Sequence, residues 1–100
     1  MSQLIRVEII LNQSVEDDLF ERLRTHQAAG HYTRIAPAYG KGNSGERQGD
    51  HTWPEENLML IIYCSPEECD RIIQAAREVK RLFPEEGITL FTLPAEHIPL

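Results

Sequence analysis

The sequence predicts a ferredoxin-like α+β fold, in which a four-stranded antiparallel sheet carries two helices on one face. The first observation is the order of the expected elements, β-α-β-β-α-β, which right-handed crossovers fold into this sheet. The second is that the first and third strands are the most apolar and therefore suit the centre. The third is Pro37 in the second strand, which places that strand at an edge because proline cannot donate to a ladder. The length of 100 residues fits one domain, residues 1–100.

The first half of the chain gives a strand, a helix and a weaker strand. Residues 4–11 are rich in β-branched side chains and predict a strand. Ser14 is the expected N-cap of the first helix, and the acidic residues after it complement the positive end of the helix dipole. We expect this helix to end near Ala29, with Gly30 as its C-terminal residue. Residues 32–39 form the second expected strand.

The second half repeats this order as strand, helix and strand. Residues 58–64 are apolar at every position, which predicts burial on both faces. Ser65 and Pro66 are typical of a helix start, and Pro84 with Gly87 ends that helix. Residues 88–93 form the last expected strand, and residues 94–100 are expected to be a short tail.

A long polar segment, residues 39–54, separates the second strand from the third. It contains four of the six glycines, and it offers too little apolar surface to form a core. Loops of this length in small domains are usually functional or disordered, so we expect a recognition loop. Its backbone N–H groups and two cations can bind a phosphate or carboxylate, although plain loop solubility explains them equally well. The candidate ligand-binding residues are Gly40, Lys41, Gly42, Asn43, Arg47 and Trp53.

A second candidate site is a metal centre. His51, with Asp50 beside it, has the donor types that suit zinc, copper or nickel, and His31 is a further candidate ligand. The alternatives are a solvated loop histidine at position 51 and a helix-end residue at position 31. No nucleophile, base and orienting group occur at a recognisable spacing, so we do not expect an enzyme.

Composition excludes other classes. The net charge of −6 argues against nucleic acid and against anionic membrane surfaces. No apolar run is long enough to span a bilayer, and the N-terminus lacks a secretion pattern, so we expect a cytoplasmic protein without membrane insertion. Cys64 and Cys69 are expected to be buried apolar groups rather than a bridge or a metal pair.

The sheet face away from the helices is the main argument for self-association. If Ile5 and its alternate neighbours lie under the helices, Leu4, Arg6, Glu8 and Ile10 point the other way. Neither register of the third and fourth strands makes this face polar. Its burial would be worth roughly 10 kcal/mol per subunit as an upper bound. The alternative cover, the tail with Ile98 and Leu100, is small, so we expect an oligomer.

Three segments carry a resemblance to the PII-like signalling superfamily. Residues 39–45 (YGKGNSG) resemble the glycine-rich base of the PII T-loop, and residues 88–98 resemble its last strand and following turn. Residues 49–57 (GDHTWPEEN) resemble the loop of small PII-like proteins encoded beside resistance-nodulation-division efflux transporters. The resemblance implies a homotrimer whose sheets line its centre and ligand sites between subunits. It also implies a loop that contacts a membrane transporter or another protein.

The chain departs from PII proteins where phosphate would bind. Its loop is short, its basic C-terminal segment is absent, and its turn at residues 83–87 is acidic. We therefore expect a sensor of a small effector, either a divalent metal ion or a nucleotide, with the nucleotide the less favoured of the two. The alternative is a divalent-metal-binding protein of the cation-tolerance type with no signalling role.

Overall fold

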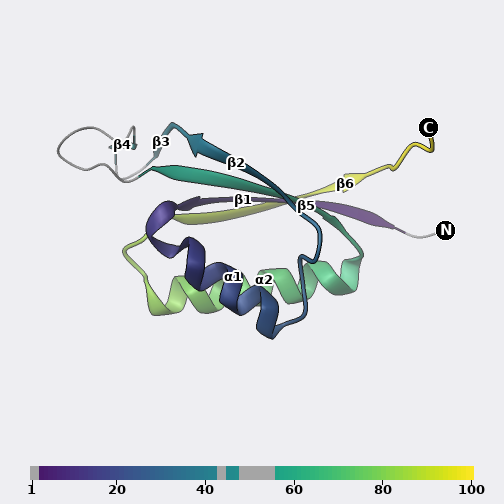
Figure 1. The fold of residues 1–100 in the computed structure, drawn as a ribbon, viewed down its shortest axis with the longest axis horizontal. Coiled ribbons are helices and arrows are strands. Elements are labelled where there is room, and N and C mark those ends of the chain that lie inside the picture. The colour runs from purple at the N-terminus through teal and green to yellow at the C-terminus, as the bar shows by residue number, and fades with distance from the viewer. Residues whose placement is uncertain (1–2, 43–44, 48–55) are drawn as a thin grey trace.

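The computed structural model describes residues 3–42, 45–47 and 56–100 (Figure 1). For residues 41, 42 and 45–47 it describes the backbone only. The elements are β1 (Leu4–Asn12), η1 (Gln13–Val15), α1 (Glu16–Thr25), β2 (Thr33–Ala38), β3 (Gly40–Gly42), β4 (Gly45–Arg47), β5 (Asn57–Cys64), α2 (Pro66–Leu82) and β6 (Ile88–Ala95).

The main sheet confirms the ferredoxin-like fold. Its strand order is β2-β5-β1-β6, and all three pairings are antiparallel. The strands β1 and β5 are central, as their apolar sequences predict. Both helices lie on one face of the sheet (Figure 1). The helices and this face enclose a core of aliphatic side chains, including Val7, Ile9, Leu60, Ile62 and Ile72.

The second helix begins as its sequence predicts. The Ser65 hydroxyl accepts a hydrogen bond from the backbone N–H of Glu68 at 3.1 Å, and Pro66 occupies the first turn. Cys64 before the cap and Cys69 in the first turn are both free and buried, as expected. Burial raises the pKa of the Cys64 thiol to about 11, with a smaller contribution from Cys69.

The first helix begins later than predicted, and Ser14 is not its cap. The Asn12 side chain instead accepts a hydrogen bond from the Ser14 N–H at 2.9 Å, which starts the 3-10 turn η1 before α1. Asn12 and Ser14 are both good capping types, and the buried position at the strand end favours Asn12.

This helix also ends earlier than predicted, at Thr25 rather than near Ala29. Gln27 adopts a left-handed conformation with φ 52°, and Ala28 N–H donates to the Leu23 carbonyl at 2.9 Å. These are the features of a Schellman cap, which usually has glycine at the left-handed position. Ala29 is also left-handed, and its N–H donates to the Glu68 carboxylate at 2.8 Å.

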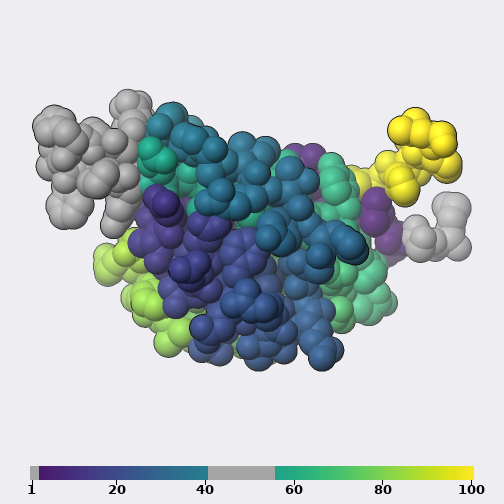
Figure 2. Space-filling model, viewed as in Figure 1, coloured from purple at the N-terminus to yellow at the C-terminus, as the bar shows by residue number. Residues whose placement is uncertain are grey.

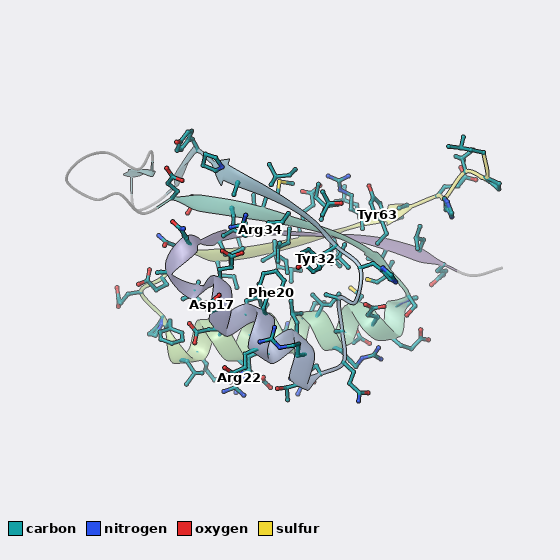
Figure 3. The ribbon with its side chains drawn as sticks, in the orientation of Figure 1. Asp17, Phe20, Arg22, Tyr32, Arg34 and Tyr63 are labelled. Carbon is teal, nitrogen blue, oxygen red and sulfur yellow. The ribbon has the colours of Figure 1, made fainter. Side chains whose placement is uncertain are left out.

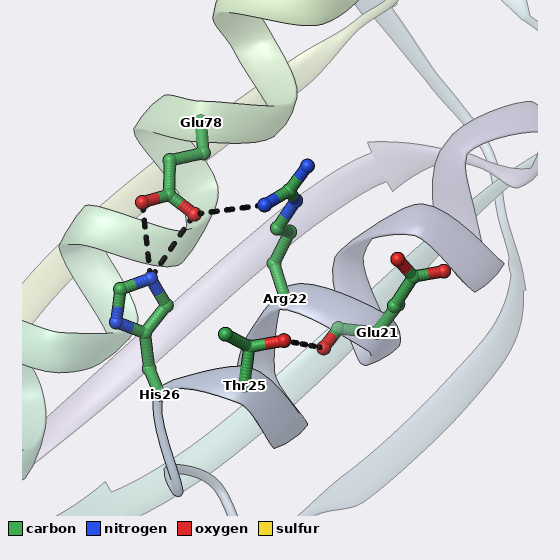
Figure 4. A network of polar contacts seen from close by, with 5 residues as sticks. All are labelled: Glu21, Arg22, Thr25, His26 and Glu78. Carbon is green, nitrogen blue, oxygen red and sulfur yellow. Dashed lines mark hydrogen bonds and ion pairs between the residues drawn. The ribbon is translucent and has the colours of Figure 1, made fainter.

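A network of polar contacts connects the two helices near the end of α1 (Figure 4). His26 Nε2 donates to both carboxylate oxygens of Glu78 on α2, at 3.0 and 3.1 Å. Arg22 lies 3.8 Å from the same carboxylate. His26 thus has a structural partner.

Both edge strands contain a proline. Pro37 lies where the register between β2 and β5 shifts, between Ile35 and Ala38. Pro94 lies within β6 opposite Ile5, so this strand runs to Ala95, past the end predicted at residue 93.

The strand β5 is buried on one face only, so the prediction of burial on both faces is wrong for a single chain. Its alternate residues Leu58, Leu60 and Ile62 are in the core, whereas Tyr63 is 52% exposed. Figure 3 shows Tyr63 on the side of the sheet away from the helices, and Phe20, Tyr32 and Arg34 on the helix side.

We call the sheet face away from the helices the open face. A cluster of three polar residues lies on this face: the Arg6 side chain donates hydrogen bonds to Glu8 and to the Tyr63 hydroxyl, each at 2.8 Å. The C-terminal tail does not cover this face: it stands clear of the body in Figure 2, with Ile98 56% exposed. The apolar side chains of the open face are Leu4, Ile10, Ile35, Met59, Ile61, Tyr63, Phe91 and Leu93.

Candidate functional site

The predicted recognition loop begins as a small β-hairpin rather than as irregular chain. Strands β3 and β4 pair in the register Gly40↔Arg47, Lys41↔Glu46 and Gly42↔Gly45. The structure therefore brings the backbones of the candidate residues Gly40 and Arg47 together, with Lys41 and Gly42 on the same strand as Gly40. The candidates Asn43, Asp50, His51 and Trp53 lie outside the described residues. Their roles stay predictions.

The base of this loop is closed by polar contacts. The Tyr39 hydroxyl lies 3.4 Å from a Glu56 carboxylate oxygen, across the two chain segments that enter and leave the loop. Ala38 at the end of β2 pairs with Asn57 at the start of β5. The carbonyl of Glu56 accepts a hydrogen bond from the Gln13 N–H at 2.7 Å.

A second segment reaches the same end of the sheet, namely the turn between α2 and β6. Its Gly87 carbonyl accepts a hydrogen bond from the Asn12 N–H at 2.8 Å. Asn12 and Gln13 thus connect the α2–β6 turn with the loop base through two adjacent backbone donors. We call this pair of residues the Asn12–Gln13 corner. Figure 1 shows the hairpin, the start of α1 and this turn at one end of the sheet.

The corner residues and Glu56 were not among the sequence-predicted site residues. Asn12 is 1% exposed, and its side chain is the only polar one fully buried in the described part of the chain. An Asn-Gln-Ser run after an apolar strand is a signal of a capped turn, but it does not indicate which distant segments the backbone will bind. That information comes only from the fold.

The described residues make this end of the molecule acidic. Lys80 donates to the carbonyls of Pro84 and Glu86 at 3.0 and 2.9 Å, so its ammonium group already stabilises the turn. Arg34 forms a two-point contact with Glu16, and this hydrogen bonding raises the pKa of Arg34. The carboxylates at this end come from the first turn of α1, the loop base and the turn: Glu16, Asp17, Asp18, Glu56, Glu85 and Glu86.

The candidate metal ligand His31 and the described base of the loop lie at opposite ends of β2. His31 is exposed just before β2, whereas the loop follows the other end of that six-residue strand, roughly 20 Å away. In residues 3–42, 45–47 and 56–100, no three His, Cys, Asp or Glu side chains gather in a way that could hold a metal ion. The roles of His31, Asp50 and His51 as metal ligands stay predictions, because Asp50 and His51 lie outside the described residues.

Comparison with known proteins points to one family. The model of the nitrogen regulatory protein P-II family matches residues 4–98. No curated protein sequence matches the chain. In the described part of the chain, no helix is long and apolar enough to cross a bilayer.

Solved structures of PII-like proteins share the fold. The nitrogen regulatory PII-like protein CPII of Thiomonas intermedia, bound to ADP and bicarbonate, is 20% identical, with 93% of this chain and 86% of that chain covered and a TM-score of 0.73. A PII-like signalling protein of Thermus thermophilus is 26% identical over 94% and 88% of the two chains, with a TM-score of 0.69. GlnK of B. subtilis, in complex with ATP, is 15% identical over 94% and 84%, with a TM-score of 0.60. The family match covers β1 through β6, including the loop and the turn that meet at the Asn12–Gln13 corner, and this chain therefore belongs to the nitrogen regulatory protein P-II family.

Proposed function

We propose that this protein is a homotrimeric regulatory protein of the cytoplasm, with no catalytic activity. It binds a small effector between subunits, beside the base of the 39–54 loop, and it contacts a membrane transporter or another protein through that loop. The convergence of the loop base and the α2–β6 turn on the Asn12–Gln13 corner carries this proposal. An effector that contacts either segment acts on the other through two adjacent residues of one strand end.

The open face supports the trimer. Phe91 and Tyr63 are about half exposed, and they share this face with the aliphatic side chains of β1, β5 and β2. Apolar patches of this kind on soluble proteins mark interaction sites. The central Arg6 is already hydrogen-bonded to Glu8 and Tyr63, so burying it leaves fewer unsatisfied donors.

An adenine nucleotide is the effector class that the relatives favour. CPII is bound to ADP and bicarbonate, and GlnK to ATP, in structures that share this fold. The acidic end of this chain favours nucleotides with fewer phosphates, because Glu85 and Glu86 repel each added phosphate group. The sequence of the hairpin adds two cations, Lys41 and Arg47, and one carboxylate, Glu46. We therefore propose ADP or AMP rather than ATP.

Isothermal titration of the full chain with ADP, AMP and ATP tests the effector. We expect saturable binding of ADP or AMP, tighter than that of ATP. Lys41→Gln should weaken binding at least tenfold, because a charged hydrogen bond to phosphate is lost. The control Arg24→Gln, at the far end of α1, should leave affinity unchanged. Absence of binding, together with unchanged hydrogen exchange in residues 39–54, would reject the sensor.

A divalent metal remains a second candidate effector, favoured by the acidic character of this end. Titration with Zn²⁺ and Cu²⁺ against the native chain and His51→Ala separates the two proposals. Stoichiometric metal binding that disappears in His51→Ala, without nucleotide binding, supports the metal-binding protein. Metal binding that survives His51→Ala counts against a site at this histidine.

A further inference from the structure

A groove on the helix side of the sheet lies outside the loop base. It runs between α2 and the edge strand β6, is open to solvent, and has a volume of about 350 Å³. This is the size of a small-molecule site rather than of a packing defect. Its lining residues are Ile73, Ala76, Arg77, Lys80, Ile88, Leu90 and Thr92.

The groove has a defined direction. The helical residues Ile73, Ala76, Arg77 and Lys80 follow at spacings of three, one and three, and so share one face of α2. The stretch of helix from Ile73 to Lys80 makes this wall about 10 Å long. Because β6 runs back along α2 after the turn, Ile88 lies toward the Lys80 end and Thr92 toward the Ile73 end.

The groove joins an apolar floor to positive charge. Four of its residues are aliphatic, and no carboxylate is among those that line it. Lys80 is already bound to two turn carbonyls. Arg77 makes no hydrogen bond or ion pair with any residue in the described ranges, although the protein carries a net charge of −6. Arg77 is thus the cation that remains available to a ligand.

We infer that this groove binds an amphipathic monoanion, a carboxylate with an apolar body about as long as the groove. The apolar body lies on Ile73, Ala76 and Leu90 and is removed from water there. The carboxylate accepts hydrogen bonds from Arg77, whose planar guanidinium can donate two in parallel. None of the groove's lining residues belongs to the 39–54 loop or to the α2–β6 turn, although Lys80 at one end of the groove bonds to carbonyls of that turn.

Octanoate is a suitable probe, and amide NMR shifts of the full chain during its titration locate the binding. We expect saturable shifts in α2 from Ile73 to Lys80 and in β6 from Ile88 to Thr92. Arg77→Gln should weaken binding at least tenfold, because the charged hydrogen bonds are lost. The control Arg71→Gln, on the same helix but outside the lining, should leave it unchanged. 1-Octanol, which has the same chain length without the charge, should bind at least tenfold more weakly.

Three outcomes would overturn the inference. The first is the absence of saturable binding, which is also the result if a second copy of the chain fills the groove. The second is a set of shifts in β5 rather than in α2, which would place the probe on the open face. The third is equal affinity of Arg77→Gln and the native chain. Repeating the titration in saturating ADP tests whether the groove is distinct from the effector site. We expect the affinity for octanoate to be the same with and without ADP.

Discussion

Replacement of Phe91 by lysine tests whether the open face holds the subunits together. Phe91 lies on the edge strand β6, directly opposite Glu8 of β1, and 51% of its surface is exposed in one subunit. Complete burial of such a side chain is worth ~1.5–3 kcal/mol, so association can gain about half of that per subunit. Over three subunits the apolar loss alone is roughly 2.5–4.5 kcal/mol, or about two to three orders of magnitude in the assembly constant. Burying the new ammonium group adds to this loss.

The same substitution leaves the subunit itself intact. The lysine faces Glu8 across the strand pair, and opposite charges at such positions are favourable by about 0.2–1 kcal/mol. Sedimentation velocity at micromolar concentration should therefore show a trimer for the native chain and a folded protomer for Phe91→Lys. Leu82→Lys is the matched control, since Leu82 is 58% exposed at the end of α2 and should still assemble. A native chain that sediments as a protomer, or a Phe91→Lys variant that still assembles, would refute the reasoning.

Three further predictions concern stability. Ser65→Ala should lower the free energy of unfolding in urea by about 1 kcal/mol through loss of the α2 cap; Ser14→Ala, the control, should change it little, and equal losses would contradict the cap assignment. Gln27→Gly should raise the unfolding free energy by about 0.5–1 kcal/mol, because glycine adopts φ 52° without strain; a lower value would show that the Gln27 side chain contributes more than the backbone costs. The Cys64 thiol has a pKa of about 11 in the folded chain, against an ordinary value of 9.0. Its contribution to the free energy of unfolding is therefore complete below pH 9 and is lost as the pH rises toward 11. The free energy of unfolding of the native chain should then fall more steeply over this pH range than that of Cys64→Ala. Parallel curves for the two proteins would contradict the burial of the thiol.

The strand order and the central positions of β1 and β5 follow from the sequence because apolar alternation and proline placement act locally. The ends of α1 do not. Asn12 and Ser14 compete for the same role, and the choice depends on the burial of Asn12 at the end of β1, where it pairs with Asn57 of β5. Gln27 and Ala29 adopt conformations that sequence preference assigns to glycine, and the hydrogen bond from Ala29 to Glu68 on the distant α2 helps to hold them.

The candidate site is harder to predict for the same reason. Glycines and cations indicate where a loop binds ligands, and Gly40 and Arg47 do pair in the hairpin. His31 precedes β2, at the end of that strand away from the loop base, and only the fold shows this separation. The Asn12–Gln13 corner acts through backbone N–H groups, which every residue but proline has, so no side-chain pattern reveals it.

The prolines of β2 and β6 help to prevent unlimited edge-to-edge association between copies of this chain. A bare sheet edge is a template on which strands from further molecules can accumulate into fibres. Pro37 and Pro94 each remove a donor from such a template, and the register shift beside Pro37 bends it as well. Strand addition is therefore disfavoured at both edges of the sheet, whereas the apolar open face can still pack against other copies to form a closed oligomer.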